Sequence, residues 1–94
     1  MAPAGVRFSR SLNRERRLMP SLRPTDYQTL IKVFAQDGFT FSRQRGDHLI
    51  YTKPGIKRPL VIPTYKAVPV FIIKNLLRTA SMTRERYFEL LQNS

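Results

Sequence analysis

The first regular pattern of apolar residues along the chain has the period of a helix. Four large side chains recur at positions i, i+3, i+4 and i+7, so they share one face of an α-helix. They are Tyr27, Leu30, Ile31 and Phe34. Thr25 and Gln28 have the spacing of a capping box, and Gly38 suits the left-handed position that ends a helix. We therefore predict an amphipathic helix over residues 25–37.

Two runs typical of β-strands follow. Residues 39–45 carry two phenylalanines and two arginines at alternate positions, which predicts that all four share one face. These residues are Phe39, Phe41, Arg43 and Arg45. Residues 48–53 are rich in β-branched and aromatic types, and Gly46-Asp47 between the two runs predicts a hairpin turn. The single histidine of the chain, His48, directly follows this turn.

A third strand is predicted over residues 58–64, after a second turn at Pro54-Gly55. Proline cannot donate a backbone hydrogen bond to a neighbouring strand. Pro59 and Pro63 therefore make this an edge strand or confine it to residues 60–62.

Two helical patterns complete the chain. Pro69 fits a first helical position, and five apolar residues after it form one stripe. The stripe consists of Val70, Ile73, Leu76, Leu77 and Ala80. Phe71 and Ile72 widen it, so this helix is either deeply buried or also docks a partner. Thr83 is predicted to cap a last helix. Its inward-facing side chains are Tyr87, Leu90 and Leu91.

The predicted order is α-β-β-β-α-α, and the simplest fold is of the α+β class. It consists of a three-stranded antiparallel sheet with helices packed on one face. The 94 residues suffice for one small domain, predicted over residues 24–94. Residues 1–23 contain six arginines and a single acid, Glu15. We interpret them as a flexible basic arm that contacts nucleic acid or a partner, or as an unselected extension.

The net charge of +11 indicates the class of partner. Such an excess attracts polyanions, so nucleic acid is the first candidate, an acidic protein the second and an anionic membrane surface the third. The lack of cysteine excludes disulfides and thiolate zinc sites. No apolar run approaches the ~20 residues of a membrane helix. We expect a cytoplasmic protein.

Four short motifs occur in order along these elements. They are "DGF" at the end of the first helix, "RQRGDHLIY", "VIPTY" and "IKNLLRTASMT". In order and spacing they resemble the HicA (YcfA-like) toxins, whose pattern is "aGF", "rqkGSHhiy", "vPvH" and "lrsiLrqaGls". The resemblance covers roughly residues 25–91.

This resemblance implies the fold of a double-stranded RNA-binding domain and the activity of a translation-independent mRNA interferase. The histidine of the "GSH" motif is the family's catalytic residue and falls on His48. The implied partner is a HicB-type antitoxin that covers the active site. The sequence departs from the pattern at Asp47, which replaces a serine and brings a carboxylate that repels phosphate. It also departs at Tyr65, which replaces a frequent second histidine, and at Phe71-Ile72, which replaces Gly-Thr.

The residue types themselves suit metal-free RNA cleavage. A base must take the proton of a 2′-hydroxyl near neutral pH, which histidine can do, and cations must bind the phosphate oxygens. The candidate cations are Arg43, Arg45, Lys53 and Lys66. Lys74 and Arg78 share a helix face and either bind RNA phosphates or form a solvated surface. The acid that protonates the leaving group is open among a lysine, Tyr51, Tyr65 and water.

No cofactor or metal is expected, because one histidine and scattered acids form no ligand cluster. Two other functions compete with a toxin endoribonuclease. One is an RNA-binding module without catalysis on the same fold. The other is a protein–protein adaptor that uses the broad apolar face of residues 70–77.

Overall fold

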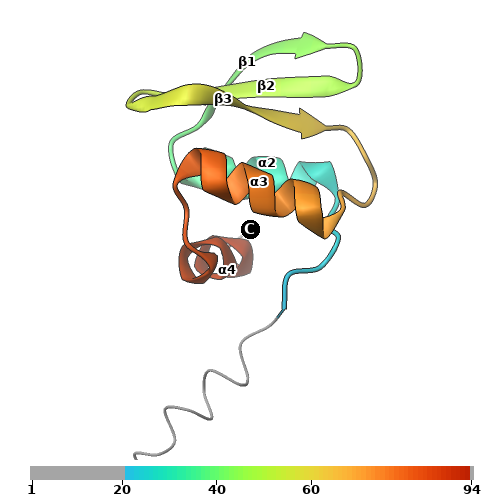
Figure 1. The fold of residues 1–94 in the computed structure, drawn as a ribbon, viewed down its shortest axis with the longest axis vertical. Coiled ribbons are helices and arrows are strands. Elements are labelled where there is room, and N and C mark those ends of the chain that lie inside the picture. The colour runs from blue at the N-terminus through green and yellow to red at the C-terminus, as the bar shows by residue number, and fades with distance from the viewer. Residues whose placement is uncertain (1–20, 94) are drawn as a thin grey trace, which may run out of the picture.

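The computed structural model describes residues 21–93, so the predicted basic arm lies almost wholly outside the described residues. The order of elements is α-β-β-β-α-α, which confirms the prediction (Figure 1). The elements are α2 (Tyr27–Gln36), β1 (Thr40–Arg45), β2 (His48–Lys53), β3 (Ile56–Pro63), α3 (Val70–Ala80) and α4 (Arg84–Gln92). No helix among residues 21–93 has the length and apolarity needed to cross a membrane.

The three strands form one antiparallel sheet in the order β1-β2-β3. Helices α2 and α3 lie against one face of this sheet, and α4 packs on α2 on the side away from the strands (Figure 1). The other face carries no helix of the described chain. The fold is therefore the predicted α+β arrangement, and β3 with its two prolines is an edge strand.

The N-terminus of α2 differs from its prediction by one residue. Asp26, not Thr25, is the N-cap, and its carboxylate accepts hydrogen bonds from the amide (3.0 Å) and hydroxyl (2.7 Å) of Thr29. These bonds, led by that of the Thr29 hydroxyl, lower the pKa of Asp26. Thr25 instead forms a β-bridge with Val68, which ties the entry of α2 to the entry of α3.

The prediction that the alternating residues of β1 share one face is wrong. Phe41 pairs with Tyr51, whereas Arg43 pairs with Ile50, so β1 advances two residues while β2 advances one. This bulge at Ser42 interrupts the alternation. Since adjacent residues of β2 point to opposite faces, Phe41 lies on the helix side and Arg43 lies on the open side.

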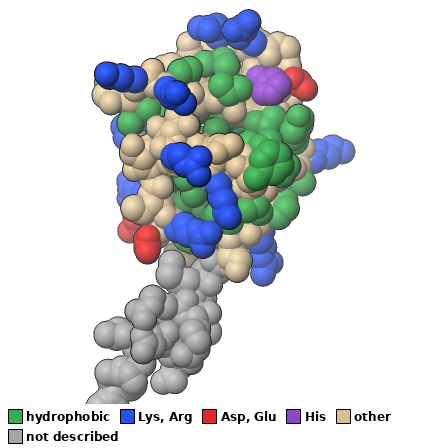
Figure 2. All heavy atoms as spheres, in the orientation of Figure 1, with side chains coloured by type: hydrophobic (Ala, Val, Ile, Leu, Met, Phe, Trp, Pro, Cys, Tyr) green, Lys and Arg blue, Asp and Glu red, His purple; other side chains and the backbone are tan. Residues whose placement is uncertain are grey.

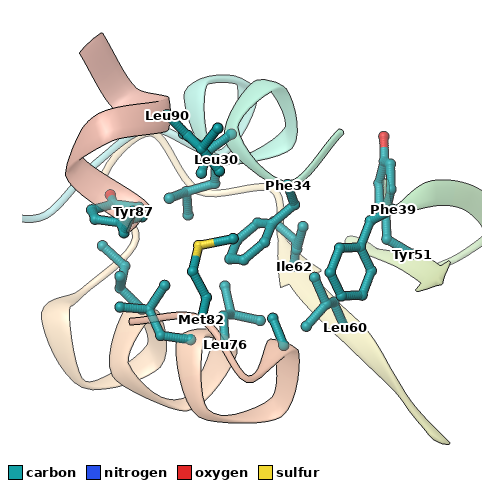
Figure 3. Close-up of a cluster of buried hydrophobic side chains, with 14 of the residues drawn as sticks. Leu30, Phe34, Phe39, Tyr51, Leu60, Ile62, Leu76, Met82, Tyr87 and Leu90 are labelled. Carbon is teal, nitrogen blue, oxygen red and sulfur yellow. The ribbon is translucent and has the colours of Figure 1, made fainter. Parts of the chain in front are cut away.

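The core lies between the sheet and the helices (Figure 3). Leu30 and Phe34 of α2 and Ile73 of α3 are fully buried there, and each such side chain contributes about 1.5–3 kcal/mol. Phe34 meets Phe39 edge to face, with ring centroids 5.8 Å apart. Both of these aromatic rings are buried. Phe41 is 55% exposed and meets the Tyr51 ring edge to face, with centroids 5.7 Å apart.

The predicted stripe of α3 is confirmed, and the residues that widen it are only partly covered. Ile73, Leu76, Leu77 and Ala80 are buried, whereas Phe71 is 66% exposed. Thr83 is the N-cap of α4, as predicted, and accepts a hydrogen bond from the Arg86 amide.

Candidate active site at the β1–β2 turn

The turn that precedes His48 is fastened to the end of β3. The backbone carbonyl of Asp47 accepts hydrogen bonds from both the amide (2.9 Å) and the hydroxyl (3.0 Å) of Thr64. Within the turn, the Gln44 side-chain amide donates to the Gly46 carbonyl at 2.9 Å, and Gly46 has a positive φ of 59°. These contacts fix the backbone from which the His48 side chain projects.

The imidazole of His48 is half-exposed and contacts the preceding carboxylate. Nδ1 of His48 lies 2.9 Å from Oδ1 of Asp47. A carboxylate oxygen beside a ring nitrogen favours a proton on that nitrogen, because two acceptors would repel each other. Nε2 is then the ring nitrogen whose lone pair is available. Exposed pairs of this kind contribute little to stability, so the contact acts on the orientation and proton position of the ring.

His48 belongs to the open face of the sheet together with two arginines. Arg45 pairs with His48 across β1 and β2, and Arg43 pairs with Ile50 two residues further on. Paired residues share a face of the sheet, so both arginines lie on the same face as His48. A shallow hollow of about 540 Å³ on this face is lined by Arg45, Gly46, His48, Ile50 and Val61.

The predicted RNA-binding residues do not all gather at His48. Lys53 lies at the other end of β2, where it forms an ion pair with Asp37 at 3.3 Å and lies 5.6 Å from the Phe39 ring centroid. Lys66 is exposed in the β3–α3 connection. Lys74 and Arg78 are exposed on α3. The structure therefore places Arg43 and Arg45 on the histidine face and the others elsewhere.

The two tyrosines proposed as leaving-group acids lie in different surroundings. Tyr51 is buried among the core residues on the helix side of β2, and this burial raises its pKa. It lies on the face of the sheet opposite to His48 and therefore cannot protonate a group held there. Tyr65 is 42% exposed in the loop after β3 and stays a candidate.

Exposed apolar side chains occur in β3 and in the segment that follows it. Val61 and Tyr65 are each more than two-fifths exposed, and Phe71 in the first turn of α3 is the most exposed of the three. Figure 2 shows the histidine beside an acidic side chain, with a hydrophobic patch below it over the start of α3. This patch resembles a protein-docking surface more than a solvated one.

Two features of the site were missed from the sequence. The contact between Asp47 and His48 had a signal, since the residues are adjacent, but the carboxylate was interpreted only as a source of repulsion. The hydrogen bonds from Thr64 had no signal, because they depend on the end of β3 lying beside the turn. Among the residues that the structure describes, no group of three or more His, Cys, Asp or Glu could hold a metal ion.

The fold and the site define a small basic α+β protein with one histidine on the open face of a three-stranded sheet. Residues 27–82 match the family described as the HicA toxin of bacterial toxin–antitoxin systems. This match spans more than half of the chain, so the chain belongs to the HicA toxin family. None of the curated proteins compared with it matches.

Proposed function

We propose that this HicA-family chain is a toxin endoribonuclease in which His48 is the general base. The observation that carries the proposal is the contact of His48 Nδ1 with Asp47 Oδ1 on a basic face of the sheet. This contact leaves Nε2 with a lone pair directed away from its own carboxylate, as a proton acceptor requires. The resemblance of "GDH" to the family's "GSH" motif supports the same residue.

The reaction needs one proton acceptor, one proton donor and cations for the phosphate. Nε2 of His48 takes the proton of a 2′-hydroxyl, and the freed oxygen attacks the adjacent phosphorus. The bond from phosphorus to the 5′-oxygen breaks, and that oxygen takes a proton from Tyr65 or water. The products are a 2′,3′-cyclic phosphate and a 5′-hydroxyl. Arg43 and Arg45 stabilise the extra negative charge on the phosphate oxygens during the attack.

A metal ion has no part in this mechanism. The imidazole supplies the base, and the two arginines supply the positive charge that a metal would otherwise bring. Chelators should therefore leave cleavage unchanged.

The test is RNA cleavage by the purified wild type beside His48→Ala. We expect the substitution to lower the cleavage rate by at least about 100-fold, the lower end of the contribution of a general base. The matched control is Thr52→Ala, an exposed residue on the same face of β2, which should retain activity. Thermal unfolding of both variants should match the wild type, because His48 contributes little to the core.

Three outcomes would contradict the proposal in different ways. A His48→Ala protein that cleaves RNA at the wild-type rate would remove His48 from the reaction. Cleavage that stops on addition of a chelator would contradict the metal-free mechanism. A wild type that binds RNA in a salt-sensitive manner and cleaves none would indicate the RNA-binding module without catalysis.

The partner that we propose is a HicB-type antitoxin, which would dock on the apolar patch beside His48. Exposed Phe71 is the best candidate anchor, because large aromatic side chains dominate protein interfaces. Phe71→Asp should weaken binding of an antitoxin encoded beside this chain by at least about 100-fold in a titration, and should leave RNA cleavage intact. Antitoxin binding that is unchanged by this substitution would place the interface elsewhere.

A further inference from the structure

A second cluster of cations lies at the end of the sheet opposite to His48. The turn between β2 and β3 meets the C-terminal end of α3 there (Figure 1). A hollow of about 310 Å³ opens between them and contains three cationic side chains, Lys57, Arg58 and Arg78. The remainder of its lining consists of one apolar residue, Ile56, and the small residues Gly55, Thr79 and Ser81. We refer to it as the distal hollow.

An irregularity in β3 positions two of these cations. Tyr51 pairs with Leu60, and Lys53 pairs with Ile56, so β3 advances four residues while β2 advances two. The extra residues fall at positions 57–59, where Pro59 lacks a backbone donor. Bulges of this kind redirect side chains at sheet edges. Here the bulge carries Lys57 and Arg58 to the edge that faces α3.

The cations of the distal hollow have no acidic partner among the residues that the structure describes. Arg78 donates to the Asn75 side-chain carbonyl at 3.2 Å, which orients the guanidinium without neutralising it. Two cations elsewhere in the described residues do have an acidic partner, since Lys53 and Arg86 both contact Asp37. Three like charges around one hollow repel each other, so the arrangement suits an anionic ligand.

We propose that the distal hollow is a phosphate-binding site for the RNA strand whose cleavage occurs at His48. Lysine, arginine and the hydroxyls of Thr79 and Ser81 are the side chains that typically contact phosphate oxygens. The proposal rests on the proposed function, because it takes RNA as the substrate. An acidic protein is the competing ligand, but the small hollow with hydroxyl groups fits a phosphate better than a broad peptide surface.

The two sites are separated by the length of the edge strand. Lys53, which pairs with Ile56 beside Lys57, lies five residues from His48 along β2. At ~3.4 Å per residue this is about 17 Å, or about five stacked nucleotides at ~3.4 Å each. Lys74 lies on α3 one turn nearer to the histidine end than Arg78, so it can contact the strand between the two sites. The distal hollow thus selects RNA long enough to reach it.

The experiment measures binding of a 12-nucleotide RNA to the full chain carrying His48→Ala, which removes cleavage as a variable. One double variant, the distal pair, carries Lys57→Gln and Arg58→Gln. The other, the control pair, carries Lys32→Gln and Arg84→Gln, which replace two exposed cations on α2 and α4. Both double variants lose two charges. We expect the distal pair to weaken binding about tenfold and to reduce the slope of log affinity against log salt by about 1.4, since each single-strand phosphate contact contributes about 0.7. The control pair should change both quantities much less.

A second measurement uses cleavage with His48 restored. The distal pair should lower kcat/KM about tenfold for the 12-nucleotide RNA and leave it unchanged for a dinucleotide, whose single phosphate is held at His48. Circular dichroism and thermal unfolding confirm that each variant folds.

The results for RNA binding at the distal hollow and for RNA cleavage at His48 can be told apart. If the distal and control pairs weaken RNA binding equally, or neither does, the distal hollow is not an RNA phosphate site, whatever the wild type cleaves. RNA binding unchanged by the distal pair would leave an acidic protein as its ligand. If the wild type cleaves no RNA but the distal pair alone weakens binding, the nuclease proposal is wrong and the distal hollow stands.

Discussion

The half of the molecule built from the strands and α3 differs sharply in charge from the half built from α2 and α4. Residues 40–82, the basic half, contain eight lysines and arginines and a single acid, Asp47. Residues 21–39 and 83–93, the neutral half, contain four of each sign. A charge that served solubility alone would be spread over both halves. The segregation indicates that the excess charge of the described residues serves binding by the strands and α3.

Three of the four acids of the neutral half have structural roles. Asp26 caps α2, Asp37 contacts Lys53 and Arg86, and Glu89 contacts Arg86. In the basic half the one acid contacts the one histidine. Substitution of the acids in the neutral half should therefore change the stability of the fold. Substitution of Asp47 in the basic half should change RNA cleavage.

Among substitutions of the acids, the largest effect is expected from Asp47→Ala in the basic half. Without the carboxylate, the proton is no longer held on Nδ1, so we expect kcat for RNA cleavage to fall about tenfold. KM should fall as well, because a group that repels phosphate is gone. Asp47→Asn is the control, since its side-chain oxygen still favours a proton on Nδ1; it should retain most of kcat.

Nitrogen-15 NMR of the His48 ring reads the tautomer directly. We expect the neutral ring to carry its proton on Nδ1 in the wild type and in Asp47→Asn, and to lose this preference in Asp47→Ala. Unfolding should be unaltered in both variants. A kcat that is unchanged or higher in Asp47→Ala would show that the carboxylate only repels the substrate.

A smaller effect, on stability alone, is expected from Asp26→Ala in the neutral half. Loss of the N-cap should cost about 1 kcal/mol at pH 7 in urea unfolding. The pKa of Asp26 is lower in the folded protein than its ordinary value of 3.8. The charged carboxylate therefore stabilises the fold above that value, and its contribution is lost as the pH falls through the folded pKa.

The difference between the wild type and Asp26→Ala should accordingly shrink when unfolding is measured at pH 3 instead of pH 7. Asp26→Asn should retain the cap at both values, because asparagine is an equally good N-cap residue. RNA cleavage should not change in either variant. If Asp26→Ala lowered RNA cleavage without lowering stability, the two halves would not have the separate roles described here.

The sequence predicted those features that depend on local periodicity. The stripe of α3, the hairpin at Gly46-Asp47 and the edge position of β3 all follow from residues a few positions apart. Features that depend on pairing between distant segments escaped prediction. Thr25 has the better local capping pattern, but its backbone is engaged by Val68, and the cap moves to Asp26.

The candidate site was predictable only in part, for the same reason. His48 could be proposed from the motif, and Arg45 from hairpin geometry, because both lie within one turn. Lys53 was expected near the phosphate, but Asp37 of a different element engages it. Lys57 and Arg58 were missed, because nothing local reveals that the bulge in β3 brings them to Arg78.

The bulge at Ser42 makes the length of β1 a determinant of function in its own right. With strict alternation, Phe41 and Arg43 would have to share a face, so either the aromatic contact with Tyr51 or the arginines beside His48 would be given up. The additional residue in β1 allows both the aromatic contact and the position of the arginines to be kept. Substitution of any single side chain would not reveal this requirement, because it is encoded in the number of residues. Insertions and deletions in β1 are therefore the changes through which relatives of this chain would gain or lose this basic face while keeping the same core.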